Sequence, residues 1–153
     1  MVDVVDKETR SRMMAGIRGR DTRPELGLRR ALHRLGFRYR LHVSRLPGRP
    51  DIVLSRHRAI VEVHGCFWHR HNDCVFKTKP ASNTEFWKRK FSDTIARDRR
   101  NQDALRRLGW RIAIVWECAI KAEGPNAVAN KVARWIVSKR SFREFGARAR
   151  LGK

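Results

Sequence analysis

Residues 46–65 read LPGRPDIVLSRHRAIVEVHG and contain two short apolar runs separated by a polar turn. The runs, Asp51–Leu54 and Ala59–Val63, are rich in β-branched residues, which is typical of a β-hairpin. Each run carries one acid, and Asp51 and Glu62 occupy matching places on the two predicted strands. A charged side chain in an apolar strand is costly unless it is paired. The hairpin therefore indicates both a sheet and a candidate site.

The same acids lie in a recognisable spacing, Pro50-Asp51 followed by Glu62-Val63-His64. This spacing resembles the PD-(D/E)xK nuclease core, in which paired acids bind Mg²⁺ and a lysine two positions later contacts water or phosphate. His64 stands in the place of that lysine. Two neighbouring carboxylates repel each other, and a hard cation such as Mg²⁺ offsets the repulsion. The alternative is that the acids lie at a sheet edge and face water.

A helix is expected ahead of the hairpin, over TRPELGLRRALHRLG, residues 22–36. Thr22 can cap its first turn, Glu25 three residues later completes a capping box, and Gly36 suits its end. Glu25 also lies where the PD-(D/E)xK fold often has an auxiliary catalytic carboxylate. The capping box is the interpretation that we favour.

Hydrophobic periodicity predicts the remaining elements. Two further strands and two further helices are expected, over residues 37–43, 111–116, Thr84–Arg107 and Pro125–Val137. The order α-β-β-β-α-β-α predicts a single α/β domain with a central mixed sheet flanked by helices.

The chain divides into three expected parts. Residues 1–20 form an N-terminal helix or arm, which either rests on the domain or clamps DNA. Residues 21–137 form the domain itself, and a length of 153 residues suits one such unit. Residues 138–153 read as a basic C-terminal tail that contacts phosphate.

The charge balance indicates nucleic acid as the partner. Lys and Arg number 36 against 15 Asp and Glu, which gives a formal net charge of +21. Phosphate neutralisation with counterion release favours binding of such a surface to nucleic acid. A basic architectural protein has the same composition, so charge alone leaves that alternative open. No long apolar run suggests a membrane span, and MVDVVDKETR lacks the apolar core of a signal peptide, so a cytoplasmic protein is expected.

Three cysteines and a histidine form a candidate structural zinc site. Cys66, His71 and Cys74 follow a C-x4-H-x2-C spacing, and Cys118 lies just beyond the apolar run at residues 111–116. A Cys₃His set is sufficient for a closed tetrahedral Zn²⁺ site. The alternative is a set of buried free cysteines.

If zinc takes His71, then His64 and His69 remain for chemistry. Asp98 lies on the predicted inward stripe of the helix over Thr84–Arg107 and is a plausible partner for His69. Such a pair would make His69 a general base toward water. Alternatively, Asp98 pairs with neighbouring arginines on its own helix.

Aromatic side chains stand among the basic residues. Phe67 and Trp68 lie between two of the candidate zinc ligands, and the tight loop predicts that they are exposed and suited to stacking on DNA bases. For Trp87 in TEFWKRK, stacking on bases and packing on the helix stripe are both open. The remaining tryptophans are expected in the core: Trp110, Trp116 and Trp135.

Taken together, the motifs LPGRPDIV, VEVHGCFWHRH with a later Cys, TEFWKRK, RDRR and LGWRIAIVWEC closely resemble the very short patch repair (Vsr) DNA mismatch endonucleases. The resemblance covers most of the chain, and HGCFWH with WEC is its most specific part. It implies a restriction-endonuclease-like fold and a bacterial, Mg²⁺-dependent enzyme that acts at the nucleoid and nicks duplex DNA on the 5′ side of the thymine in a T:G mismatch.

The resemblance also implies roles for individual residues. Asp51 would bind Mg²⁺ with the main-chain carbonyl of Val63, His69 with Asp98 would serve the attacking water, and His64 would contact the phosphate. The zinc ligands would be the Cys₃His set. The DNA contacts would be the aromatic residues and two residues of the N-terminal arm: Phe67, Trp68, Trp87, Met14 and Ile17.

The chain departs from the family pattern in two places. Glu62 stands where family members need not carry an acid, and it would add a side-chain Mg²⁺ ligand. One extra residue, Asn72 or Asp73, lies between His71 and Cys74 and alters the expected zinc loop.

The leading hypothesis is a monomeric mismatch endonuclease, with mismatched duplex DNA and a recruiting protein of mismatch repair as partners. Two alternatives are kept. One is a related nicking enzyme of other mismatch or restriction-linked specificity. The other is a zinc-stabilised DNA-binding protein without catalytic activity, in which acids facing phosphate would have no purpose.

Overall fold

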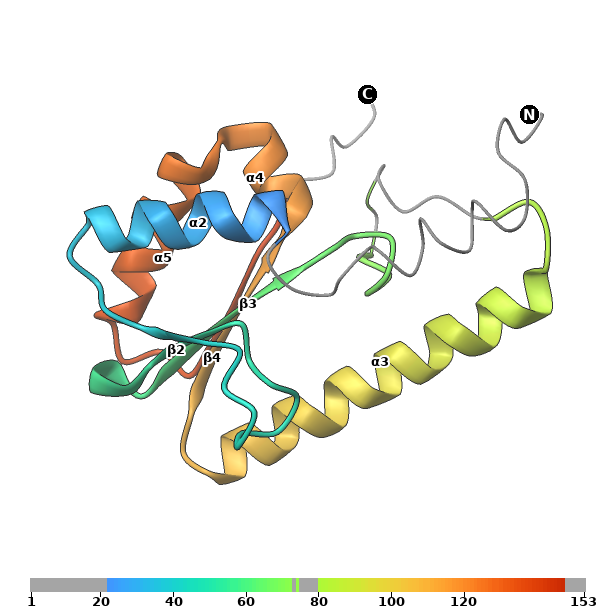
Figure 1. Ribbon diagram of the computed structural model, residues 1–153, viewed down its shortest axis with the longest axis horizontal. Coiled ribbons are helices and arrows are strands. Elements are labelled where there is room, and N and C mark those ends of the chain that lie inside the picture. Colours follow the sequence, from blue (N-terminus) through green and yellow to red (C-terminus); the bar gives the residue numbers. More distant parts are fainter. Residues whose placement is uncertain (1–21, 73, 75–79, 148–153) are drawn as a thin grey trace.

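The predicted hairpin lies in the middle of a five-stranded sheet of strand order β1-β2-β3-β4-β5. The computed structural model describes residues 22–72, 74 and 80–147. In chain order the elements are α2 (Arg23–Arg34), β1 (Arg40–Leu41), β2 (Ile52–Leu54), the 3₁₀ helix η1 (Ser55–His57), β3 (Ala59–His64), α3 (Thr84–Arg107), β4 (Arg111–Trp116), α4 (Glu117–Glu123), α5 (Pro125–Ile136) and β5 (Phe142–Phe145) (Figure 1).

The sheet is mixed, as expected. β1, β2 and β3 pair antiparallel, whereas β3–β4 and β4–β5 pair in parallel. Ile52 is the partner of Val61 in the hairpin, so Asp51 and Glu62 are the next pair at the same end of the sheet. The matching positions predicted for the two acids are confirmed.

Helices cover both faces of the sheet, which agrees with the α/β prediction. Leu28 and Leu32 of α2 pack with Val132 of α5 against one face, where α4 also lies (Figure 1). Leu105 of α3 packs against the opposite face with Ile60 and Ile112. Since side chains alternate along each strand, the β-branched residues of β3 and β4 fill both cores. Figure 1 shows that α3 crosses its face and extends well beyond the sheet.

Local signals account for the helix ends. The Thr22 hydroxyl accepts the Glu25 backbone N–H at 3.3 Å, and Pro24 lies in the first turn of α2. Gly36 and Gly109, which follow α2 and α3, have φ of +98° and +88°, a backbone region that favours glycine. The predicted bounds of α3 agree with the structure at both ends.

The C-terminal region corrects the prediction of a basic tail from residue 138. Phe142–Phe145 forms β5, which lies parallel to β4, and Phe145 is buried in the core on the α2 and α5 side. The helix α4 was also not anticipated, and the strand expected over residues 37–43 is limited to Arg40–Leu41.

Residues 1–21 and 148–153 lie outside the described residues, so the predicted N-terminal arm and the end of the tail are not described. Within the described part, no helix has both the length and the apolar character needed to cross a membrane.

Candidate active site and metal centre

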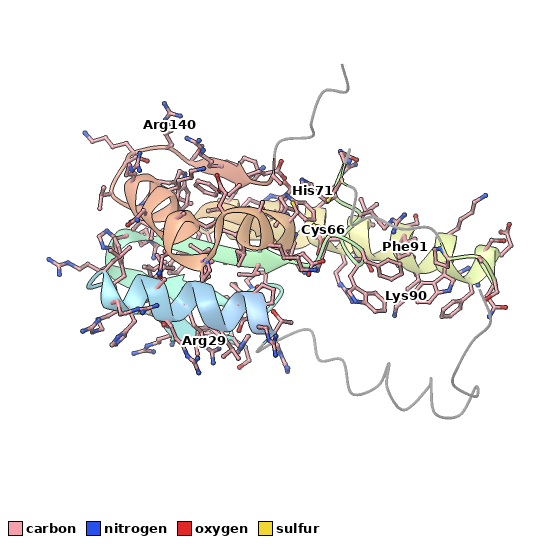
Figure 2. The ribbon with its side chains drawn as sticks, turned by 90° about the horizontal axis from the view of Figure 1, so that it is seen from above. Arg29, Cys66, His71, Lys90, Phe91 and Arg140 are labelled. Atoms are coloured by element: carbon pink, nitrogen blue, oxygen red, sulfur yellow. The ribbon has the colours of Figure 1, made fainter. Side chains whose placement is uncertain are left out.

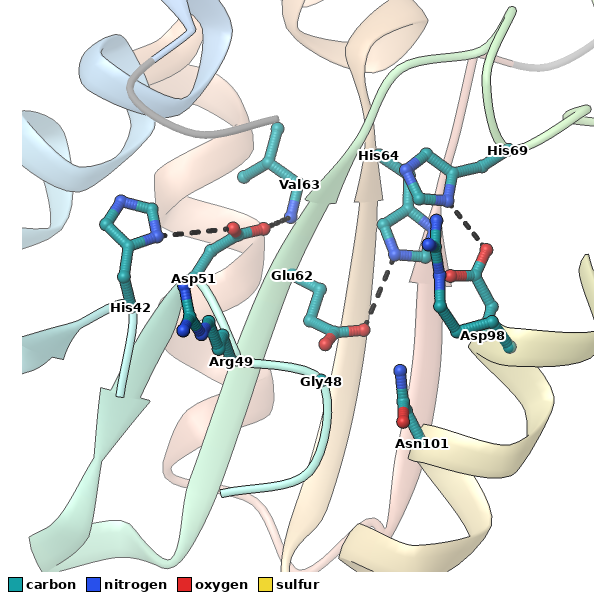
Figure 3. Close-up of a pocket in the computed structure, with 11 residues that line it drawn as sticks. His42, Gly48, Arg49, Asp51, Glu62, Val63, His64, His69, Asp98 and Asn101 are labelled. Atoms are coloured by element: carbon teal, nitrogen blue, oxygen red, sulfur yellow. Dashed lines mark hydrogen bonds and ion pairs between the residues drawn. The ribbon is translucent and has the colours of Figure 1, made fainter. Parts of the chain in front are cut away.

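A cavity of about 690 Å³ opens beside the paired ends of the hairpin strands (Figure 3). The loop before β2, the end of β3, the turn after β3 and the middle of α3 all contribute to its wall. The lining is strongly polar and includes six of the residues singled out from the sequence or its resemblance: Asp51, Glu62, Val63, His64, His69 and Asp98. The fold therefore brings these residues together in one place.

Asp51 is held at the base of this cavity by its own hairpin. Its Oδ2 accepts the backbone N–H of Val63 at 2.8 Å. The pKa of Asp51 is raised from 3.8 to about 8, mainly by burial and also by the nearby charges of Glu25 and Glu62, while the hydrogen bond from Val63 opposes the rise. A carboxylate in this environment is stabilised by a bound cation.

Glu25 lies in this site as well as at the start of α2. Its side chain is only 2% exposed, and its Oε2 lies 3.0 Å from Nη1 of Arg29 and 3.3 Å from Nε2 of His42. The Thr22 cap is present, but the capping box that we favoured does not account for the Glu25 carboxylate. The carboxylate lies beside His42 and Asp51, and its auxiliary catalytic role stays a prediction.

His42 completes a cluster that the sequence analysis missed. Its Nδ1 lies 3.7 Å from Oδ1 of Asp51, so the imidazole stands between the Asp51 and Glu25 carboxylates. The ligand atoms of Glu25, His42 and Asp51 lie within 4.8 Å of one another, close enough to hold a metal ion together. The only sequence signal was a histidine at the end of an alternating run, and such a residue usually has no special role.

Glu62 and His64 form a second pair on the other side of β3 (Figure 3). The Glu62 Oε2 lies 3.4 Å from the His64 Nε2. Glu62 thus contacts His64 of the cavity, and its negative charge helps to raise the pKa of Asp51. Its two expected roles, catalytic partner and cation ligand, both remain compatible with this position.

His69 and Asp98 come together from the turn after β3 and from α3. The His69 Nδ1 lies 2.6 Å from the Asp98 Oδ2, so the predicted pairing is present, whereas pairing of Asp98 with neighbouring arginines was the alternative. Burial lowers the pKa of His69 below 6.5, and the charge of His64 lowers it further, while the hydrogen bond to Asp98 opposes this. The rings of His64 and His69 stack with centroids 3.8 Å apart.

The four candidate zinc ligands meet at the other end of the same turn. The ligand atoms of Cys66, His71, Cys74 and Cys118 lie within 4.8 Å of one another, which permits one metal ion. The His71 Nδ1 is 3.4 Å from the Cys118 Sγ and 3.7 Å from the Cys66 Sγ. The extra residue before Cys74 does not prevent closure of the loop, although Asp73 itself lies outside the described residues.

Neighbouring elements hold this Cys₃His cluster in place. The Glu117 Oε1 at the start of α4 accepts the Cys66 backbone N–H at 3.1 Å, and the Cys118 Sγ accepts the Ala147 N–H at 3.3 Å. The His71 ring stacks on Trp116 with centroids 4.2 Å apart. Burial raises the pKa of both the Cys66 and Cys118 thiols, so a bound metal would be needed to keep them as thiolates at neutral pH.

The aromatic residues form one half-buried cluster where α3 leaves the sheet. Phe67 contacts Trp68, Trp87 and Phe91 with ring centroids 5.1 to 5.5 Å apart. Arg70 lies 4.0 Å above the Phe91 ring, and Figure 2 shows Phe91 and Lys90 on the part of α3 beyond the Cys66–His71 turn. The expected exposure of Phe67 and Trp68 is therefore only partial, and Trp87 packs within the same cluster.

The other tryptophans differ from one another. Trp116 and Trp135 are buried as expected, with 7% and 3% of each residue exposed. Trp110 is only partly buried and carries the Arg58 guanidinium 4.6 Å from its ring centroid. Trp110 packs against the edge of the core on the α3 side, so the prediction that it lies in the core is confirmed only in part.

A basic groove borders the aromatic cluster along α3. It has a volume of about 740 Å³, and its wall contains Arg70, Lys88, Arg99 and Arg100 together with Phe91. A groove with cations beside aromatic rings suits a phosphate backbone and unstacked bases. The groove and the cavity both draw on α3 and the turn after β3, but they use different residues of α3.

Comparison with known proteins places this geometry in context. The family model described as DNA mismatch endonuclease Vsr matches residues 2–75. The chain is 43% identical over 139 residues to the DNA mismatch endonuclease Vsr of Escherichia coli, covering 89% of this chain and 88% of that protein. It is 43% identical over 124 residues to the type II nicking enzyme V.XorIIP of Xanthomonas oryzae pv. oryzae, covering 81% and 90%. It is 40% identical over 121 residues to the type II nicking enzyme V.NmeAIP of Neisseria meningitidis, covering 79% and 86%.

Proposed function

Because the chain belongs to the Vsr family of DNA mismatch endonucleases and is a DNA endonuclease, we propose that it nicks duplex DNA on the 5′ side of the thymine in a T:G mismatch, with Mg²⁺ as cofactor. Such a nick would begin very short patch repair. The observation that supports this most is the cavity in which Asp51 and the His69–Asp98 pair face the same space.

The proton chemistry follows from the His69–Asp98 pair. When Nδ1 of His69 donates to Asp98, its Nε2 is an acceptor, and the lowered pKa keeps the ring neutral at neutral pH. His69 then takes a proton from water as the water oxygen bonds to the phosphorus. The bond from phosphorus to the leaving oxygen breaks, and that oxygen takes a proton from solvent. His64, stacked on His69 and paired with Glu62, would contact the phosphate.

The residues around Asp51 fit a divalent cation. Asp51, the main-chain carbonyl of Val63 and Glu62 would hold Mg²⁺, because buried oxygen donors with excess negative charge are the ligands this ion prefers. When bound, Mg²⁺ would offset negative charge on the phosphate as the reaction proceeds. Asp51 would hold the cation, and the Val63 N–H holds the Asp51 carboxylate in place.

A structural Zn²⁺ ion would occupy the Cys66, His71, Cys74 and Cys118 cluster. Three thiolates and one imidazole form a complete tetrahedral set with no open position, which is typical of a structural rather than a catalytic ion. The ion would fix the turn that carries His69 and the aromatic residues. Zinc would therefore support the geometry of the active site without taking part in the reaction.

Mismatched duplex DNA is the proposed partner. Phe67, Trp68 and Trp87 would enter the base stack, and the basic groove along α3 would follow the phosphates. Met14 and Ile17 of the proposed N-terminal clamp lie outside the described residues. A recruiting protein of mismatch repair would be a further partner.

A nicking assay tests the proposal. End-labelled duplexes with each of the possible mismatches and with matched pairs are incubated with the protein in Mg²⁺ or EDTA. We expect a single nick 5′ of the thymine in T:G duplexes with Mg²⁺ and none in EDTA. Absence of cleavage of T:G duplexes in every sequence context would refute the proposal, whereas cleavage of another mismatch or of a matched site would favour a restriction-linked nicking specificity.

A further inference from the structure

We propose that His42, with Glu25 beside it, adds a nitrogen ligand to the catalytic cation that Asp51 holds, so that this site binds Mn²⁺ more selectively over Mg²⁺ than oxygen ligands alone would. The inference rests on the proposed function, which supplies the cation. His42 would supply a nitrogen ligand to this cation, whereas the hairpin acids supply only oxygen ligands and the zinc cluster binds a different ion.

The position of the imidazole supports this role. The two ring nitrogens face two different carboxylates, Glu25 at 3.3 Å and Asp51 at 3.7 Å. Ligand atoms on neighbouring corners of an octahedral ion lie about 3 Å apart when each is about 2.1 Å from the metal. Only one ring nitrogen can bind the ion, and one ligand atom from each of Glu25, His42 and Asp51 lies within 4.8 Å of the others, so the three residues can reach a shared cation. Figure 3 shows the ring directed toward Asp51 from the side away from Glu62 and His64.

The backbone of His42 is built to hold the ring there. His42 follows β1 directly and has φ of +46°, a left-handed conformation that non-glycine residues seldom adopt. Its N–H donates to the Asp51 carbonyl at 3.1 Å, which ties the residue to the strand that carries the ligand. Unfavourable backbone conformations of this kind cluster at binding sites. With only 14% of its side chain exposed, the ring is fixed against the site.

The chemistry of the donors sets the expected selectivity. Mg²⁺ prefers oxygen ligands, whereas imidazole nitrogen raises affinity for first-row transition metals. An imidazole in the coordination shell should therefore favour Mn²⁺ relative to Mg²⁺. If His42 were instead only a positively charged partner of the two acids, its removal would change the affinity for both ions in the same proportion.

The test is Mn²⁺ binding to the full chain with its structural cluster loaded, followed by electron paramagnetic resonance. Pulsed measurements detect directly bound ¹⁴N. We expect ¹⁴N modulation in the unmodified protein and its loss in His42→Gln. That variant should lose about tenfold in Mn²⁺ affinity and less than about threefold in Mg²⁺ affinity, the latter measured by competition. His33→Gln is the matched control, because His33 is an exposed histidine of α2 outside the cavity, and it should behave like the unmodified protein.

Further variants separate the possible failures. Asp51→Asn should abolish Mn²⁺ binding at this site; if it binds Mn²⁺ normally, the cation site of the proposed function is wrong. If Asp51→Asn loses the ion while His42→Gln keeps both the ¹⁴N modulation and the Mn²⁺ to Mg²⁺ ratio, only the His42 inference is overturned. His42→Asp provides a second variant if His42→Gln does not fold, and it should bind Mn²⁺ without ¹⁴N modulation.

Discussion

Replacing Asp51 with asparagine should stabilise the cation-free protein at neutral pH while removing its response to divalent cations. Burial and the neighbouring acids Glu25 and Glu62 make a negative charge on Asp51 unfavourable. The pKa of Asp51 is therefore raised from 3.8 to about 8. The asparagine side chain would carry no charge, and its amide oxygen can still accept the Val63 N–H. The substitution therefore removes the repulsion and keeps the main local contact.

The magnitude follows from the pKa difference. One pKa unit corresponds to about 1.4 kcal/mol, so at pH 7.5 the difference between the folded and unfolded pKa of Asp51 destabilises the cation-free fold by at most about 5 kcal/mol. A neutral acceptor forms a weaker hydrogen bond with Val63, which offsets about 1–2 kcal/mol. We expect a net gain of about 3 kcal/mol, which raises Tm by about 6–12 °C in a protein of this size.

The pH dependence gives the sharpest form of this prediction. Because the folded pKa of Asp51 lies above its unfolded value, its stability contribution is largest at acid pH and is lost as pH rises toward 8. The stability gap between Asp51→Asn and the unmodified protein should therefore widen from pH 5 to pH 7.5, by up to about 3 kcal/mol.

Urea unfolding in buffer without added divalent cations measures the gap, and Asp103→Asn is a matched control because Asp103 is exposed on α3. Mg²⁺ should stabilise the unmodified protein and Asp103→Asn, but not Asp51→Asn. A gap that does not change with pH, or an Asp51→Asn protein that is less stable at pH 7.5, would refute the reasoning.

Three further predictions address other parts of the structure. His69→Ala should slow nicking at least about a hundredfold in single-turnover assays. With saturating Mg²⁺, which keeps Asp51 ionised, the rate of the unmodified protein should fall only below pH 6.5, because the pKa of His69 is lowered; a near-normal rate for His69→Ala would exclude it as the base. Cys66→Ser should lose bound zinc, measured by atomic absorption, and should unfold at lower urea; purified protein without metal would contradict the zinc assignment. Deletion from residue 138 should prevent stable folding because it removes β5 and buried Phe145, whereas Phe145→Ala should cost about 3–5 kcal/mol in urea unfolding; a truncated protein with unchanged stability would show that β5 is dispensable.

The parts of the fold with strong local patterns were predictable from the sequence. The hairpin has two β-branched runs separated by a polar turn, and α3 has apolar residues at helical spacing and is followed by a glycine, although Ile95 of that spacing is exposed. The His69–Asp98 pair was also within reach, since Asp98 falls on that stripe. β5 was missed because Phe142–Phe145 lies in a basic segment and is too short to show a clear alternation.

The missed parts of the site depend on contacts between distant segments. His42 is defined by its two carboxylate neighbours and by a left-handed backbone, and neither is visible in FRYRLHV. Glu25 fits a capping box by spacing alone, and only the approach of α2 to the hairpin brings it to Asp51. The aromatic residues were predicted one loop at a time, whereas the structure packs Phe67 and Trp68 against Trp87 of α3.

The most direct test of the central claim is to map the nick on a T:G duplex labelled separately on each strand, comparing the unmodified protein with Asp51→Asn and Asp103→Asn in Mg²⁺. The account predicts one nick, on the thymine strand and 5′ of the mispaired base, made by the unmodified protein and by Asp103→Asn. Asp51→Asn should bind the duplex without cutting it. Cleavage by Asp51→Asn at the normal rate would contradict the claim that the cavity around Asp51 and His69 is the active site.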